Sequence, residues 1–263
     1  MASNATAEPA GLRMMKIEMP HNESRAGLSI WYPNGGGGDQ TVVAKNGVFY
    51  GVNHWTRVED LSAALDALLA DPAFTDHIDI SRIMAAGFFY GEWTALLMGG
   101  MTGNHAGINE ACTTNIDEME AYDQLLSEGV NIQGTDPDIR NASYADVRIT
   151  HVTAIDPGLA WGLAAVNVAG LSPNVNMIGF GGPNDRMSAT NFDESGLTDF
   201  LSGAKMTRFD PSFHFTAIPL CTPAVEAIVI ADKDESVFTD PVGTDRATVH
   251  CEIINIIANE LGL

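Results

Sequence analysis

Residues 87–91 read GFFYG and lie between the apolar run RIMAA and the segment EWTALLMGG. This order predicts a buried strand that turns sharply into a helix, with a glycine on each side of the turn. A side chain at the middle of such a turn projects from the end of a sheet, where a serine can act as a nucleophile. The middle residue is Phe89, whose phenyl ring can neither lose a proton nor attack a carbonyl carbon.

The rest of the chain alternates between segments typical of strands and of helices. Apolar or alternating runs predict strands at 27–33, 48–54, 82–87, 148–156, 175–182 and 204–211. Helical periodicity predicts helices over 57–71, from near Glu92, and from about Asp245 to the C-terminal end. The last of these has an apolar face that carries Val249, Ile253, Ile256, Ile257 and Leu261.

This alternation predicts an α/β fold with a mostly parallel sheet flanked by helices. Residues 27–263 are expected to form a single domain, after a flexible leader and first strand region at 1–26. The polar, partly helical stretch 103–147 is typical of a cap or an insertion. Chemistry in such folds lies beyond the C-terminal ends of the strands. Those ends fall at Asn53–His54, at 87–91, at Asp156 and at Asn184–Asp185, together with the loop around His214.

Taken in order, these segments resemble the α/β-hydrolase fold, and within it the dienelactone hydrolases related to platelet-activating-factor acetylhydrolase. The matching pieces cover most of residues 27–263 and keep the order of that family. They are LSIWYP, VNHWTRVEDLSAALDALLAD, ISRIMAAGFFYGEWTALLMGG, DVRITHVTAIDPGLA, NMIGFGGPNDRMSATN, FHFTAIPLCTP and FTDPVGTDRATVH. The resemblance implies a sheet that is shortened on its N-terminal side, because only NGGGGDQTVVAKNG separates the first two predicted strands.

The resemblance also implies a set of site residues. In the family a serine attacks the carbonyl carbon of an ester or lactone, a histidine takes its proton, and a carboxylate orients the histidine. These roles fall on Phe89, on His214 and on Asp185, with Asp156 as the alternative acid. His214 lies between two phenylalanines and Asp185 lies in a turn-like GPND, so both also have purely structural interpretations.

Two departures from the family affect the expected function. The serine position is occupied by Phe89, and the short segment after residue 33 leaves little room for the usual oxyanion-binding turn. Three hypotheses follow. The chain is a relative of ester or lactone hydrolases that is inactive or strongly impaired, or it is a non-catalytic protein that binds a ligand in the old cleft, or it is a hydrolase in which His214 and Asp185 activate water.

Charge limits the partners. The chain carries 34 acidic and 13 basic residues, a formal net charge of −21, which argues against binding to nucleic acid or to anionic membranes. No apolar stretch approaches the ~20 residues that span a bilayer. Residues 1–11 lack the pattern of a signal peptide, and their composition is compatible with a mature secreted or periplasmic protein.

The three cysteines, Cys112, Cys221 and Cys251, show no metal-ligand spacing and leave their pairing open. We expect neither a cofactor nor a metal site. The expected partner is a small-molecule ester or lactone, and the oligomeric state stays open.

Overall fold

The computed structural model describes residues 10–19, 24–33, 42–45, 54–114, 132–158, 160–182, 190–220, 227 and 237–263. The chain divides into two compact units, residues 1–83 and residues 84–263, and each is described by itself. Among the helices of these ranges, none combines the length and the apolar character that crossing a membrane would require.

The first unit contains an antiparallel sheet in the order β1-β2-β3. Its strands are β1 (Ala10–Met19), β2 (Ser24–Pro33) and β3 (Val42–Lys45), followed by helix α1 (His54–Ala70) and the short 3₁₀ helix η1 (Thr75–His77). Ile17 and Met19 alternate with exposed residues along β1, as expected for a strand with one buried face. They form a core with Ala64, Leu68 and Phe74.

The strand predicted at 27–33 lies within β2, and the helix predicted at 57–71 is found as α1. The strand predicted at 48–54 lies outside the described residues except for His54. That residue is the first of α1, so the prediction is wrong at this position.

The second unit is built on a four-stranded sheet in the order β4-β5-β6-β7. Its strands are β4 (Ile83–Phe88), β5 (Ile149–Ile155), β6 (Val175–Phe180) and β7 (Lys205–Phe209). β5 and β6 run parallel, as do β6 and β7. All six residues of β6 are buried, which is typical of a strand covered on both faces. The predicted α/β fold with a mostly parallel sheet is thereby confirmed.

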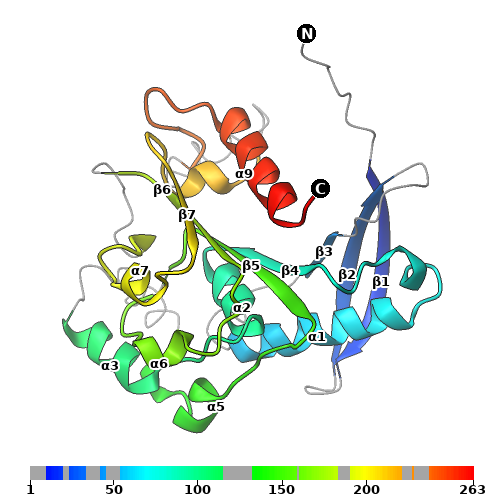
Figure 1. Cartoon of the computed structure of the whole chain (residues 1–263), viewed down its shortest axis with the longest axis horizontal. Helices are drawn as coiled ribbons and strands as arrows, with labels where there is room; N and C mark the ends of the chain where they lie inside the picture. The colour runs from blue at the N-terminus through cyan, green and yellow to red at the C-terminus, as the bar shows by residue number, and fades with distance from the viewer. Residues whose placement is uncertain are drawn as a thin grey trace. The chain divides into compact units, whose positions relative to one another are not determined.

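Two helices flank this sheet on opposite sides: α2 (Tyr90–Met98) and α9 (Arg246–Glu260) (Figure 1). Ile178 and Phe180 of β6 form a buried cluster with Val249 and Ile253 of α9. Val152 of β5 projects to the other face, toward the end of α2. The predicted start of the last helix is confirmed, since the side chain of its N-cap Asp245 accepts hydrogen bonds from two backbone N–H groups of the first turn.

The remaining elements of this unit are short and connect the strands. They are α3 (His105–Thr114), η2 (Ile132–Gly134), α5 (Pro137–Asn141), α6 (Ala165–Val168), α7 (Leu197–Phe200) and η4 (His214–Ala217). The stretch expected to form a cap or an insertion, 103–147, includes α3, η2 and α5, and its residues 115–131 lie outside the described ranges.

Candidate active site

Phe89 occupies a sharp turn between β4 and α2. Its backbone angles are φ 53° and ψ −118°, and it is the N-cap of α2. A bulky side chain at positive φ is rare, and such a conformation costs about 1–3 kcal/mol. The Phe89 N–H donates to the carbonyl oxygen of Ile155 at 3.1 Å, so the ends of β4 and β5 lie side by side at this turn. The geometry is that of a strand-to-helix elbow, as residues 87–91 predicted.

The two glycines of the turn differ in their surroundings. A Cβ atom on Gly87 would lie 2.0 Å from the carbonyl oxygen of Gly91, so only glycine fits at position 87. A Cβ atom on Gly91 would meet nothing within 4 Å. The close approach of strand and helix at this turn therefore excludes a side chain at position 87 but not at position 91.

His214 and Asp156 form a buried pair beside this elbow. His214 Nδ1 lies 2.6 Å from Asp156 Oδ2, and the side chains of both residues are almost wholly buried. The second carboxylate oxygen of Asp156, Oδ1, accepts a hydrogen bond of 2.9 Å from the backbone N–H of Phe180. Both oxygens of this carboxyl group thus have hydrogen-bond partners. Because Nδ1 faces the acid, Nε2 is the imidazole nitrogen left to act as a base.

Aromatic rings surround the imidazole of His214. The ring centroid of Phe88 is 4.6 Å from it in a stacked arrangement, and that of Phe89 is 4.7 Å away, edge to face. Phe215 adds a third ring at 5.1 Å. Only 2% of His214 is exposed, so these contacts keep water from the imidazole in this conformation.

The ring of Phe89 also lies against the loop after β5. A Cβ atom on Gly158 would come within 2.7 Å of Phe89 Cε2, so the ring occupies the space that a side chain at 158 would need. The carbonyl oxygen of Gly158 accepts a hydrogen bond of 2.7 Å from Trp93 Nε1, which holds this loop against the first turns of α2. Position 89 is therefore packed closely on the loop side as well as on the His214 side.

Sequence reasoning missed one residue of this site, Glu92 in the first turn of α2. It is only 1% exposed, and within the described part of the chain neither of its carboxyl oxygens has a hydrogen-bond partner. Burial raises the pKa of Glu92 well above the ordinary value of 4.5, and the nearby carboxylate of Asp156 raises it further. The sequence held a signal, because Glu92 precedes the run WTALLM, and a helix that is apolar on all sides must bury its polar residues too.

Three of the predicted site residues, Phe89, His214 and Asp156, are thus brought together at the C-terminal edge of the sheet. Asp185, the acid that the resemblance placed first, lies outside the described residues. So does the segment 34–41, which begins the short stretch with little room for an oxyanion-binding turn. In the part of the chain that the structure describes, no three His, Cys, Asp or Glu side chains gather as a metal site would need.

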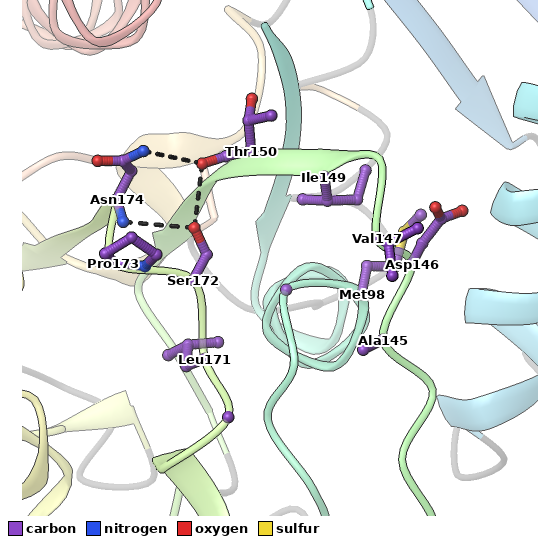
Figure 2. Close-up of a pocket in the computed structure, with 12 residues that line it drawn as sticks. Met98, Ala145, Asp146, Val147, Ile149, Thr150, Leu171, Ser172, Pro173 and Asn174 are labelled. Carbon is purple, nitrogen blue, oxygen red and sulfur yellow. Dashed lines mark hydrogen bonds between the residues drawn. The ribbon is translucent and has the colours of Figure 1, made fainter. Parts of the chain in front are cut away.

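A shallow hollow of about 460 Å³ lies at the opposite edge of the same sheet (Figure 2). Residues at the start of β5, before β6 and at the end of α2 line it. Ser172 Oγ and Asn174 Nδ2 each donate to the carbonyl oxygen of Thr150 at 3.0 Å, and Asp146 pairs with Arg148 beside the hollow. In parallel α/β sheets the amino edge of the strands is not where reacting groups gather. We therefore assign the candidate active site to the edge with Phe89.

Comparison with known proteins does not establish an activity for this chain. No protein-family model matches the chain, and no curated protein matches it. Among solved structures, one described as "The structure of esterase Est22" matches with 14% sequence identity and a TM-score of 0.49. The match covers 98% of this chain and 83% of that chain. A likeness at this level carries no information on activity.

Proposed function

We propose that this protein is a hydrolase-like α/β protein related to ester and lactone hydrolases of the dienelactone hydrolase type. We also propose that it does not catalyse the serine-type hydrolysis of those enzymes. The observation that carries the proposal is the position of Phe89. Phe89 lies at a strand-to-helix elbow and has backbone angles like those of a nucleophile at such a turn. Its ring centroid is 4.7 Å from that of the His214 imidazole, which belongs to a buried histidine–aspartate pair.

The chemistry that this site would support with a serine at position 89 is acyl transfer. His214 Nε2 would take the hydroxyl proton as the oxygen attacks the carbonyl carbon, and Asp156 would hold the imidazole by its Nδ1–H. The backbone N–H after the nucleophile, that of Tyr90, would be one oxyanion donor. A phenyl ring has no atom that can form the acyl bond, so the site has no nucleophile for His214 and Asp156 to activate.

Activation of water by His214 is the hydrolase alternative, and the geometry argues against it. A general base must lie within about 2.6–3.2 Å of the water or hydroxyl whose proton it takes. The rings of Phe88, Phe89 and Phe215 cover the imidazole, and His214 is 2% exposed. A ligand-binding role in the old cleft would require the ring of Phe89 to leave His214, and no observation of the site favours that role.

Turnover of short-chain p-nitrophenyl esters and of a simple lactone tests the proposal. We expect the protein to show no hydrolysis above the rate of buffer, and His214→Ala to be indistinguishable from it. Hydrolysis by the unchanged protein that disappears in His214→Ala would overturn the proposal and establish the water-activating alternative.

A further inference from the structure

The site contains two buried carboxyl groups, and they differ in the donors that surround them. Asp156 Oδ2 faces His214 Nδ1 at 2.6 Å, and Asp156 Oδ1 accepts from the N–H of Phe180 at 2.9 Å. Glu92 is equally buried, at 1% exposure, yet neither of its oxygens has a hydrogen-bond partner among the residues that the structure describes. An ionised carboxylate in the interior needs donors or a counter-charge, because burial without them is strongly unfavourable.

The surroundings of Glu92 supply no such counter-charge. The charged group that faces it is Asp156, at the end of β5, and the titratable group behind that aspartate is His214 of η4, whose Nδ1 is already engaged. No hydrogen bond or ion pair joins the carboxyl of Glu92 to a basic side chain in the described part of the chain. Two ionised carboxylates in this interior would repel each other across a medium of low dielectric constant, and Asp156 accordingly raises the pKa of Glu92 further.

We propose that Glu92 is a positioning residue of this site that carries its proton in the folded protein at neutral pH. The hydrogen-bond donors at this edge of the sheet, His214 Nδ1 and the backbone N–H of Phe180, both face Asp156, whereas Glu92 has none among the described residues. The neutral acid of Glu92 lets the first turn of α2 pack against the end of β5 without charge repulsion.

The pH dependence follows from linkage. In the unfolded chain Glu92 loses its proton near its ordinary pKa of 4.5, whereas in the folded protein its pKa lies well above that value. Above pH 4.5 the unfolded chain has lost this proton and the folded protein still binds it, so folding takes up a proton. The stability that is fully present below pH 4.5 is therefore lost as the pH rises toward the folded-state pKa of Glu92. The protein should become less stable from about pH 5 to about pH 8 for this reason.

Glu92→Gln tests the inference because glutamine keeps the shape of the neutral acid and cannot ionise. We expect the melting temperature of the variant to fall less than that of the unchanged protein between about pH 5 and about pH 8. Glu252→Gln, on an exposed site of α9, is the matched control and should follow the unchanged protein across the range. Equal slopes for Glu92→Gln and for the unchanged protein would overturn the inference.

A second measurement does not depend on the folding of the variant. The carboxyl carbon of Glu92, followed by NMR in protein labelled on glutamate, should keep the shift of a neutral acid at neutral pH, while exposed glutamates titrate in their usual range. A Glu92 signal that titrates with the exposed glutamates would contradict the inference. Neither result depends on ester hydrolysis, so the inference and the proposed silent function can fail separately.

Discussion

The two edges of the parallel sheet in the second unit present opposite kinds of surface. The C-terminal edge holds a buried histidine–aspartate pair, an unpaired buried carboxyl group and a ring on a strained backbone, with almost no exposed area on His214. The amino edge holds an open hollow in which Ser172 and Asn174 donate to the carbonyl oxygen of Thr150 (Figure 2). Buried polar groups on a strained turn, rather than open volume, therefore mark the candidate site. The ring of Phe89 fills the space beside His214 at that edge.

The largest expected effect comes from removing the hydrogen-bond partner of a buried acid at the C-terminal edge. His214→Ala leaves the carboxyl group of Asp156 buried with a single donor, the N–H of Phe180, and removes a buried ring as well. A buried polar group that loses its partner costs about 1–3 kcal/mol or more, so the free energy of unfolding in urea should fall by at least that amount. His77→Ala, at an exposed histidine of η1, is the control and should leave it unchanged. A loss below about 1 kcal/mol would mean that the pair is not desolvated as described.

A smaller effect tests how tightly the ring of Phe89 fills the site. Gly158→Ala introduces a Cβ atom 2.7 Å from that ring, and overpacking of this kind costs about 1–3 kcal/mol. Combining it with Phe89→Ser removes the clash, so a double-mutant cycle should give a favourable coupling of similar size. Gly203→Ala, which would meet nothing within 4 Å, is the matched control. Additive effects at 89 and 158 would show that the ring lies elsewhere in solution.

The smallest effect is expected at the amino edge. Ser172→Ala removes the hydrogen bond to the carbonyl oxygen of Thr150 and the weaker one from the backbone N–H of Asn174, and we expect a loss of about 0.5–1.5 kcal/mol in unfolding free energy. Introduced beside Phe89→Ser, it should leave any reaction at position 89 unaltered, because the two sites lie at opposite edges of the sheet. A change in that reaction would indicate that the two edges are coupled.

Much of the fold could be predicted from local pattern. Four short apolar runs became the four strands of the parallel sheet, and Asp245 marked the start of the last helix. The strand Ala10–Met19 was not predicted separately from the leader region, although Met15, Ile17 and Met19 alternate with polar residues there. This segment is a strand of a sheet because it pairs with β2. The sequence of one segment does not specify which other segment it will pair with.

The candidate site was less accessible from sequence. The turn around Phe89 has a local signature, because Gly87 has to accommodate the carbonyl oxygen of Gly91. The contact between His214 and Asp156 joins residues 58 positions apart and depends on the course of the chain between them. The unpaired state of Glu92 depends on whether its neighbours in space offer hydrogen-bond donors, and the spacing of residues in the sequence does not indicate this.

The most direct test of the central claim is covalent labelling with a fluorophosphonate, followed by intact-mass measurement and peptide mapping. The unchanged protein should not react. Phe89→Ser should gain one label at position 89, because His214 lies beside that position to take the hydroxyl proton. The reaction should be slow, because the short segment after residue 33 leaves little room for the usual oxyanion-binding turn. Phe89→Ser combined with His214→Ala should not react, since the hydroxyl then has no base. Labelling of the unchanged protein, or labelling of Phe89→Ser that survives the loss of His214, would contradict the account.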